Sequence, residues 1–456
     1  MRLITIHQDA VHVENHSELI SHKNISDGVT VLTRDRLRRA LPTLSEYTHR
    51  LMPRRVLITV GEVSGDRNAA NFARELKKLD PAIIIDGLGG NSMREADVNV
   101  HHDTVSRATM GLRAFLRAAE VRRYLAWTRH YYRTTPPDLH VSVDSWTMNC
   151  HFARIAKKTG KPVLYYIAPQ AWASRPGRVK RMRRDIDCLA CILPFEQEWF
   201  SSRGVNATFV GHPLFDHLSM RVDASTTKSF DPTAPVIGIL PGSRRGIVRN
   251  NLPSLLDAAA IIRREFPGTR FLIPTTQNAD EVVRKILIER AGAGASTGGF
   301  TATLDAFDEM VPRCDLCLTV SGTAALHVAA HNVPLIVVYR GSWVLWNLIG
   351  RWLINARTFS LVNILANGGR IGAGPKIAPE FVPWHGPAEP VAQCAIDYLR
   401  HPEKLAEQRR RLFEMIEPLA TAGASKKVAE LAMELMNGPT TSSPDSPLSS
   451  VIRTNQ

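Results

Sequence analysis

Acidic and polar side chains follow the first strongly apolar run of the sequence at a glycine turn. Residues 56–60 read Val-Leu-Ile-Thr-Val and end at Gly61, and Glu62, Ser64 and Asp66 come directly before a helical pattern. Strand, glycine turn and helix form the usual ligand site of a Rossmann-type fold, but a loop that holds a pyrophosphate would not carry two carboxylates. This turn therefore indicates a ligand other than a nucleotide.

Two turns in the second half of the chain have the opposite character. Ser243 and Arg244 follow an apolar run and precede a helix, and the Arg244 guanidinium can bind a phosphate through two N–H groups. Ser321, Gly322 and Thr323 follow another such run, and the free N–H groups of a helix start suit a phosphate. Ser-Gly-Thr is also a common helix cap, but together the two turns favour a diphosphate site.

A carboxylate stands at the end of a third apolar run. Asp144 follows residues 139–143, at the carboxyl edge where open α/β sheets bind their ligands. A carboxylate there can accept a proton from a hydroxyl group that attacks across a cleft. Capping of the next helix is the other interpretation, and spacing alone does not decide between them.

Composition and charge limit the class of protein. The 456 residues are 44% hydrophobic and 22% charged, as in globular proteins, and suffice for two or three domains. The net charge of +14 favours polyanions such as nucleic acid, anionic lipid headgroups or phosphorylated substrates, or else reflects a generally basic surface. No apolar run is long enough to span a bilayer, and the N-terminus lacks the apolar core of a signal peptide.

Two cysteine pairs have the spacing of zinc ligands. Cys188 and Cys191, and likewise Cys314 and Cys317, lie in apolar runs with no turn between them. A chelating pair needs a turn, so we interpret all four as buried structural cysteines.

Short runs rich in Val, Ile and Leu alternate with helical patterns from residue 56 onward, which predicts parallel sheets covered by helices on both faces. About ten such runs are too many for one sheet, and a polar stretch at 217–235 divides them. We therefore predict an α/β fold of two Rossmann-like domains whose parallel sheets face a cleft. The predicted ranges are an extension at 1–53 whose order the sequence leaves open, domains at 54–225 and 226–436, and a disordered tail at 437–456.

Several motifs together resemble the lipid-A-disaccharide synthases, inverting GT-B glycosyltransferases of family 19. The resemblance covers about residues 56–435 and rests on GEVSGD, LPGSR, SGTAAL, YYIAPQAWA and FVGHPLFD, with MGL at residue 110 and LPFE at residue 193. It implies transfer of 2,3-diacylglucosamine from UDP-2,3-diacylglucosamine to 2,3-diacylglucosamine 1-phosphate (lipid X). The products would be the β-1,6-linked disaccharide 1-phosphate and UDP.

The resemblance also implies roles for the site residues. Asp144 would be the general base that deprotonates the acceptor 6-hydroxyl, and Arg244 and the helix start at Ser321 would stabilise the leaving diphosphate. The acceptor would contact Glu62, Ser64, Gly65, Asp66 and Asn149 in the first domain. The UDP-sugar would contact Ser243, Arg244, Ser321, Gly322, Thr323, His327, Asn363 and Glu380 in the second. Neither a metal nor a cofactor is expected.

Three positions depart from the family pattern. Thr147 replaces the second carboxylate after the base, His327 replaces a glutamate, and Pro383 replaces a glutamine. These changes keep open a related GT-B transferase or epimerase that uses another UDP-sugar. A catalytically silent basic protein that binds RNA or membrane is the third hypothesis. RNA is disfavoured because aromatic and basic residues do not interleave along a strand.

Acylated substrates imply contact with a bilayer surface. Residues 110–133 have the pattern of a basic amphipathic helix, with Leu125 and Trp127 among its apolar positions, and we expect it at the membrane interface. Residues 342–354 contain three tryptophans, and here packing on the core is slightly favoured. We expect a cytoplasmic protein, peripheral on the inner face of the cytoplasmic membrane, with no nucleic-acid partner and with a homodimer as one candidate assembly.

Overall fold

The structure is a computed structural model of the 456-residue chain. It describes residues 2–7, 10–15, 53–105, 114–173, 176–216, 218, 230–291, 299–340, 360–370, 372, 374–420 and 423–438. The chain forms two units, residues 1–53 and 54–456, and each is described by itself. In the first unit, β1 (Arg2–His7) pairs antiparallel with β2 (Ala10–Asn15), so the predicted extension contains regular structure. The predicted tail lies, beyond residue 438, outside the described residues.

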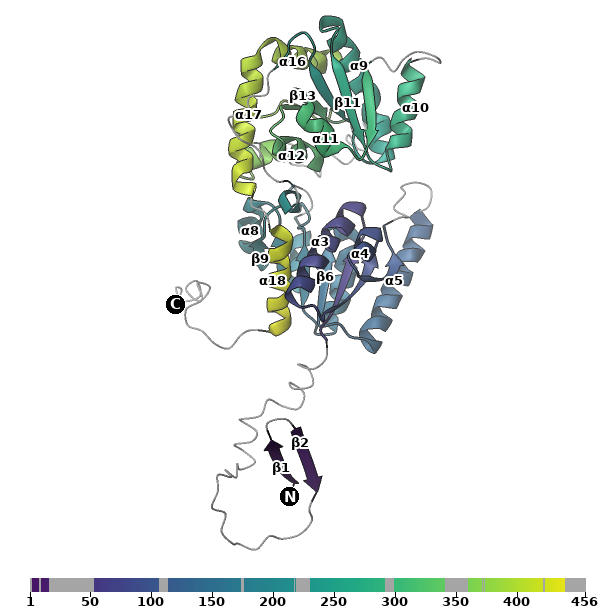
Figure 1. The fold of residues 1–456 in the computed structure, drawn as a ribbon, viewed down its shortest axis with the longest axis vertical. Helices are drawn as coiled ribbons and strands as arrows, with labels where there is room; N and C mark the ends of the chain where they lie inside the picture. The colour runs from purple at the N-terminus through teal and green to yellow at the C-terminus, as the bar shows by residue number, and fades with distance from the viewer. Residues whose placement is uncertain are drawn as a thin grey trace. The chain divides into compact units, whose positions relative to one another are not determined.

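The first sheet of the second unit has seven strands, all parallel, in the order β5-β4-β3-β6-β7-β8-β9 (Figure 1). Its strands are β3 (Arg55–Val60), β4 (Ile84–Gly89), β5 (Asn99–Asp103), β6 (Leu139–Val143), β7 (Val163–Tyr166), β8 (Cys188–Cys191) and β9 (Ala207–Phe209). The helices that accompany it are α3 (Val63–Leu79), α4 (Asn91–Glu95), α5 (Ala114–Thr134), α6 (Trp146–Lys158), α7 (Arg178–Asp185), α8 (Pro194–Ser201) and η1 (Pro213–Asp216).

The second sheet has six parallel strands in the order β12-β11-β10-β13-β14-β15. Its strands are β10 (Val236–Leu240), β11 (Arg270–Thr275), β12 (Phe300–Leu304), β13 (Leu316–Thr319), β14 (Leu335–Val338) and β15 (Glu380–Phe381). The helices that follow these strands are α9 (Arg245–Glu265), α10 (Asp280–Ala291), α11 (Phe307–Met310), η2 (Val311–Arg313), α12 (Thr323–Ala330), α15 (Leu361–Ala366), α16 (Glu389–Arg400), α17 (Pro402–Ile416), η4 (Glu417–Leu419) and α18 (Ala424–Asn437).

The central strands are buried on both faces. Every residue of β6, β7, β8, β10, β13 and β14 is buried, because helices cover both sides of each parallel sheet. The two-sheet α/β prediction is confirmed, and each of the ten apolar runs forms a strand. The six cysteines are free thiols, and Cys188, Cys191, Cys314 and Cys317 are buried, as predicted.

Each sheet reverses its strand order once, and this reversal fixes where a ligand can bind. The first sheet grows outward in both directions from β3 and β6, and the second from β10 and β13. In open α/β sheets the crevice outside the carboxyl ends of two such strands is the usual ligand site. The loop after β3 is the acidic turn, and the loop after β6 contains Asp144. The loops after β10 and β13 are the two turns predicted to bind a diphosphate.

The last described helix returns to the first sheet. Val428, Ala429 and Ala432 of α18 are fully buried in the core formed by β3, β6, β7 and α3, and α18 lies against α3 (Figure 1). The range 226–436 predicted for the second domain thus includes a helix that belongs to the core of the first sheet. The sequence shows the apolar face of α18 but not which sheet that face covers.

Asp216 holds the first turn of α18. Its Oδ1 accepts hydrogen bonds from the N–H groups of Gly423 and Ala424, both at 2.8 Å, and its Oδ2 accepts one from Ser425 at 2.9 Å. Because a carboxylate at a helix start satisfies N–H groups that lack helical partners, we expect Asp216→Ala to lower the free energy of unfolding by about 2 kcal/mol. Urea denaturation followed by tryptophan fluorescence measures this. Asp257→Ala, which removes an exposed ion pair with Arg290, should have a clearly smaller effect; an equal effect would contradict this role.

Glu196 of the LPFE motif is a buried carboxyl group. It accepts hydrogen bonds from Trp172 Nε1 at 2.9 Å and from the Leu193 N–H at 3.2 Å. Burial raises the pKa of Glu196 from 4.5 to about 7, although these hydrogen bonds act in the opposite direction. The motif therefore has a structural role at the start of α8, where Glu196 accepts a hydrogen bond from the main-chain N–H of the N-cap residue Leu193.

This buried carboxyl group predicts a pH dependence of stability. Between pH 4.5 and about 7 the folded protein holds a proton on Glu196 that the unfolded chain has released. The free energy of unfolding should therefore fall, by about 3 kcal/mol in total, as the pH rises through that window. Urea denaturation at a series of pH values measures the slope, which Glu196→Gln should flatten. Exposed Glu198, on the same helix, is the matched control, and an unchanged slope in Glu196→Gln would refute the assignment.

Candidate active site

Asp144 is held in an unusual backbone conformation at the end of β6. Its φ is +52° and that of Ser145 is +45°, so two consecutive non-glycine residues lie in the left-handed region. The Asp144 carbonyl accepts hydrogen bonds from Tyr165 Oη at 2.6 Å and from Asn149 Nδ2 at 2.8 Å. The Ser145 N–H donates to the Asp144 carboxylate at 2.7 Å. Such strain at a strand end is typical of functional sites, because surrounding contacts must fix the residue.

The surroundings of Asp144 make it a stronger base than an ordinary aspartate. Burial raises the pKa of Asp144, and the nearby Glu62 carboxylate raises it further. The Ser145 N–H and the Arg244 guanidinium oppose this rise. A carboxylate with a raised pKa accepts a proton from a hydroxyl group more readily, which suits a general base.

Arg244 and Glu62 join the two strand-order reversals. Arg244 Nη2 lies 2.5 Å from Glu62 Oε2, and both side chains remain substantially exposed, at 57% and 42%. Arg244 precedes α9 after β10, and Glu62 precedes α3 after β3. Both charges also act on Asp144. The structure therefore brings together two carboxylates and one arginine from loops that follow strands of the two sheets.

Gly65 and Ser64 lie beside this group in the first turn of α3. A Cβ atom on Gly65 would lie 3.1 Å from Val60 Cγ1 and 3.6 Å from Asp144 Cβ, so glycine allows α3 to pass close to the strand ends. Ser64 is exposed and available to a ligand.

Asp66 and Asn149 hold the site together rather than facing a ligand, which corrects their predicted roles. Asp66 is only 2% exposed, and its two oxygens accept hydrogen bonds from the N–H groups of Gly90 at 2.7 Å and Ser92 at 2.9 Å. Asn149 is fully buried, and its Nδ2 donates to the carbonyls of Thr59, Val143 and Asp144. Both residues position the loops that carry Glu62 and Asp144.

The two turns that were predicted to bind a diphosphate form an open surface where the strand order of the second sheet reverses. Ser243 and Thr323 are exposed, and Ser321 and Gly322 are partly exposed. Gly322 has a φ of +140°, and a Cβ atom there would meet nothing within 4 Å. The starts of α9 and α12 thus present main-chain N–H groups beside Arg244, an arrangement that suits a diphosphate.

Asn363 and Glu380 are hydrogen-bonded to each other and have buried side chains, so their predicted role of direct contact with the ligand is also corrected. Asn363 is fully buried; its Nδ2 donates to Glu380 Oε1 and to the Ala378 carbonyl, both at 2.8 Å. Its Oδ1 accepts from the N–H groups of Ile377 and Ala378 at 2.8 and 2.9 Å. The Glu380 side chain is only 2% exposed and also accepts from the Ser360 N–H. The pair fixes the loop before β15 against α15.

The His327 side chain contacts neighbouring protein side chains, Asp308 and Phe307. Its Nε2 lies 2.6 Å from Asp308 Oδ1, and its ring stacks on Phe307 with 4.1 Å between ring centres. Burial lowers the pKa of His327, and the nearby Asp308 carboxylate partly offsets this.

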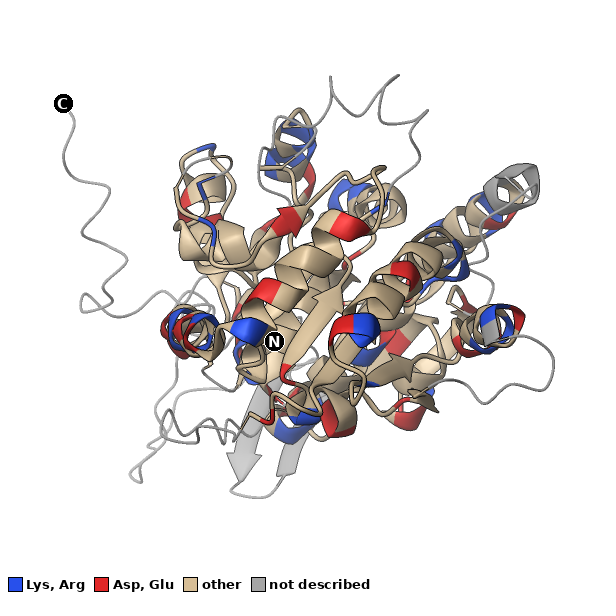
Figure 2. Ribbon diagram, turned by 90° about the horizontal axis from the view of Figure 1, so that it is seen from above, with Lys and Arg blue, Asp and Glu red and all other residues tan. Residues whose placement is uncertain are grey.

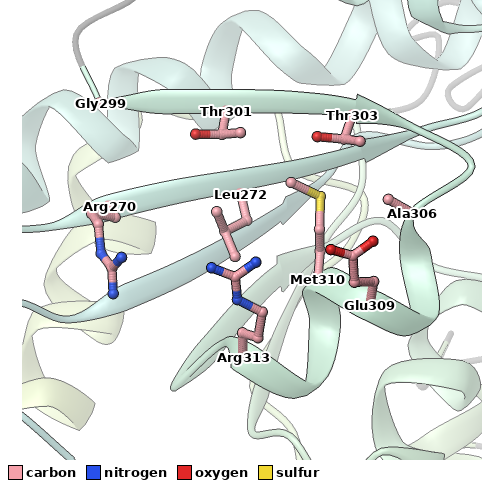
Figure 3. A pocket seen from close by; sticks show the side chains of 9 residues that line it. All are labelled: Arg270, Leu272, Gly299, Thr301, Thr303, Ala306, Glu309, Met310 and Arg313. Carbon is pink, nitrogen blue, oxygen red and sulfur yellow. The ribbon is translucent and has the colours of Figure 1, made fainter.

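Among the pockets in the described part of the chain, two differ in their relation to the predicted site residues. One of about 260 Å³, shown in Figure 3, lies between β11, β12 and α11 and contains none of the predicted site residues. The other, of about 570 Å³, lies at the start of α6, which begins two residues after Asp144. It is lined by Trp146, Thr147, Cys150, His151, Gly177, Arg178 and Arg181. The second combines an apolar wall with two arginines, and its only signal in the sequence is the basic run after YYIAPQAWA.

The expected membrane helix packs partly on the protein core. Within α5, Trp127 stacks on Tyr131 with ring centres 4.9 Å apart, and Leu125 packs beside buried Tyr124. Leu125 and Trp127 are partly exposed as well as partly packed, and the location of this segment at a membrane interface stays a prediction. Residues 110–113 of that segment, and all of 342–354, lie outside the described residues. Among the described helices, none is both long enough and apolar enough to cross a bilayer.

Acidic and basic residues lie side by side along many of the helices in Figure 2. On α17, for example, Arg410 pairs with both Glu407 and Glu414. The helix α7 differs, because it contains five basic residues and a single acidic one, Asp185. Part of the positive charge excess therefore lies at the pocket lined by Arg178 and Arg181.

Two parallel α/β sheets, each with its polar loops at the strand-order reversal, define a GT-B enzyme. Comparison with known proteins narrows the class. The chain belongs to the lipid-A-disaccharide synthetase family, whose model matches residues 56–434, and it is accordingly a glycosyltransferase of lipid A biosynthesis.

A similar sequence supports the family, and similar solved structures support the fold. A lipid-A-disaccharide synthase of Geobacter metallireducens is 33% identical over 387 residues, which cover 84% of this chain and 97% of the relative. The fold resembles that of a UDP-GlcNAc 2-epimerase from Neisseria meningitidis, with a TM-score of 0.55, 12% identity, and coverage of 84% of this chain and 100% of that one. It also resembles the glycosyltransferase of kitacinnamycin, with a TM-score of 0.53, 13% identity, and coverage of 84% and 99%.

Proposed function

We propose that the protein transfers 2,3-diacylglucosamine from UDP-2,3-diacylglucosamine to the 6-hydroxyl of 2,3-diacylglucosamine 1-phosphate, forming a β-1,6 linkage and releasing UDP. Family membership supports this reaction. The observation that carries it is the meeting of partly buried Asp144 with the Glu62–Arg244 pair at the reversals of both sheets.

The proposed step is a single inverting displacement. Asp144 accepts the proton of the acceptor hydroxyl as its oxygen bonds to the anomeric carbon, and the bond from that carbon to the UDP oxygen breaks on the opposite face. Arg244 and the N–H groups at the starts of α9 and α12 stabilise the charge on the leaving diphosphate.

Donor binding would free Glu62 for the acceptor by separating the Glu62–Arg244 pair. A diphosphate can bind both donor edges of the Arg244 guanidinium and so compete with Glu62 for it. Because the pair is exposed, separating it costs little. Released Glu62 can then accept a hydrogen bond from a sugar hydroxyl, and Ser64 lies exposed beside it.

The pocket lined by Trp146, Cys150, Arg178 and Arg181 suits the phosphate and an acyl chain of the acceptor. Arg178 and Arg181 provide positive charge for a phosphate, and Trp146 and Cys150 provide an apolar wall for an acyl chain. The acceptor resides in a bilayer, so the protein would work at the inner face of the cytoplasmic membrane, where basic α7 also favours anionic headgroups.

The test is a reaction with both acylated substrates in detergent micelles, followed by UDP release and by the mass of the lipid product. We expect UDP and an acylated disaccharide phosphate in equal amounts. Turnover of UDP-GlcNAc but not of the diacylated donor would favour the second candidate, a related UDP-sugar enzyme, which is motivated by the departure at His327. Binding without any turnover would favour a catalytically silent protein.

A further inference from the structure

Three side chains capable of binding a metal meet on the second sheet, beside but separate from the proposed diphosphate site. They are Asp308 of α11, His327 of α12 and His331, which follows the last residue of α12, and one ligand atom from each lies within 4.8 Å of the others. His327 Nε2 and His331 Nε2 lie 2.6 and 2.8 Å from the same oxygen, Asp308 Oδ1. The two histidines are four residues apart and therefore lie on one face of α12.

The rings are held in place for this arrangement. The His327 ring lies against Phe307, with 4.1 Å between ring centres, and next to His331, at 5.3 Å, with both pairs of planes within 21° of parallel. His331 makes a hydrogen bond with Asp308. His327 Nε2 is shielded from solvent and lies against the same Asp308 oxygen that His331 contacts. Two imidazole nitrogens directed at one carboxylate oxygen form a set of ligands that a bound cation would join.

We propose that Asp308, His327 and His331 form a site for one divalent transition-metal ion, of which Zn²⁺ fits best. Two imidazoles and one carboxylate are zinc ligands, and water can fill the fourth position because the Asp308 side chain is 61% exposed. In a tetrahedral zinc site the ligand atoms lie about 3.3 Å apart, so each histidine nitrogen must move about 0.6 Å further from Asp308 Oδ1, and the two histidine nitrogens must reach the same spacing from each other. The exposed carboxylate can make this adjustment by rotation.

The ion would link α11 to α12. Its ligand His327 lies one helical turn beyond Thr323, so an ion there would fix the helix whose start forms the Ser321–Thr323 turn. The site takes no part in the displacement itself, and its existence does not depend on the proposed reaction.

The experiment is titration of the purified full chain, without a purification tag, with CoCl₂ and then ZnCl₂. Bound Co²⁺ gives visible absorption bands whose intensity reports four-coordinate geometry, and Zn²⁺ should displace it. Because the chain has 16 histidines, the wild type is compared with Asp308→Asn and His331→Ala, and His401→Ala is the matched control. His401 also lies beside a carboxylate on a helix, that of Asp397, but outside the cluster.

We expect one Co²⁺ site that survives in His401→Ala and whose affinity falls at least about tenfold in each cluster variant. Circular dichroism shows which variants are folded, and near-isosteric Asp308→Asn keeps the test available if His331→Ala does not fold. Equal Co²⁺ stoichiometry and affinity in the wild type and Asp308→Asn would overturn the proposal. A wild type that binds no Co²⁺ at millimolar concentration would do the same.

Discussion

Asp144→Asn should lower kcat for disaccharide formation by about 10²- to 10⁴-fold while leaving the Kd for UDP nearly unchanged. The loss is expected because asparagine cannot accept the proton of the acceptor hydroxyl. Steady-state UDP release gives kcat, and calorimetric titration with UDP gives the Kd. Loss of UDP affinity with little loss of kcat would remove Asp144 from the base role.

The choice of asparagine follows from the backbone. Asp144 has a φ of +52°, and asparagine tolerates the left-handed region better than alanine does. Asp97 is a matched control, because it has a φ of +59° and lies on the surface beside Lys77. Asp97→Asn should retain wild-type kcat, so a loss confined to Asp144→Asn reports chemistry rather than folding.

The pH profile provides an independent check on the same residue. The base must be ionised, so kcat/KM should fall as the pH drops through the raised pKa of Asp144. Because the Glu62 charge contributes to that rise, Glu62→Gln should lower the pKa of Asp144 and move this acid limb to lower pH. A limb that stays in place in Glu62→Gln would show that another group controls it.

Arg244→Ala should lower kcat/KM by about 10²- to 10³-fold and also weaken UDP binding, because the diphosphate loses a charged donor in both the ground state and the transition state. Removal of this positive charge should also raise the pKa of Asp144 and shift the acid limb to higher pH, opposite to Glu62→Gln. The same UDP-release assay over a pH series measures both effects.

The neighbouring arginine supplies the control. Arg245 pairs with Glu281 of α10 at 2.9 Å and is equally exposed, but it does not act on Asp144. Arg245→Ala should therefore leave kcat/KM within about twofold of the wild type. If the two alanine variants lost activity equally, a general loss of positive surface charge would explain the result better than contact between Arg244 and the diphosphate.

The parts of the fold that were predicted are those whose burial is written into the sequence. Central strands such as β6 and β13 are buried on both faces and therefore appear as continuous apolar runs. Of the four edge strands described in the two parallel sheets, only β9 (Ala207–Phe209) was predicted, and β15 (Glu380–Phe381) was missed. The strand β5, with the sequence Asn-Val-His-His-Asp, and the edge strand β12 have one open side and were not predicted.

The site divides in a similar way. Glu62, Asp144 and Arg244 follow central strands, and the reversal of strand order brings them together, so motif and position sufficed. Motifs give residue types but not the direction in which a side chain points. Asp66 and Asn363 were therefore predicted to contact ligands, although their polar atoms are engaged by nearby main-chain groups. The Trp146 pocket depends on two helices distant in sequence, which no local pattern reveals.

The return of α18 to the first sheet has a consequence for any attempt to dissect the protein. The polypeptide crosses between the sheets twice, once before β10 and once before α18, and Asp216 ties the two crossings together through the Gly423 to Ser425 N–H groups. A truncation placed after η4 would keep every strand of the second sheet yet uncover the apolar face of α3 on the first. Neither half can therefore be expressed alone by a single cut without exposing apolar surface of the first core.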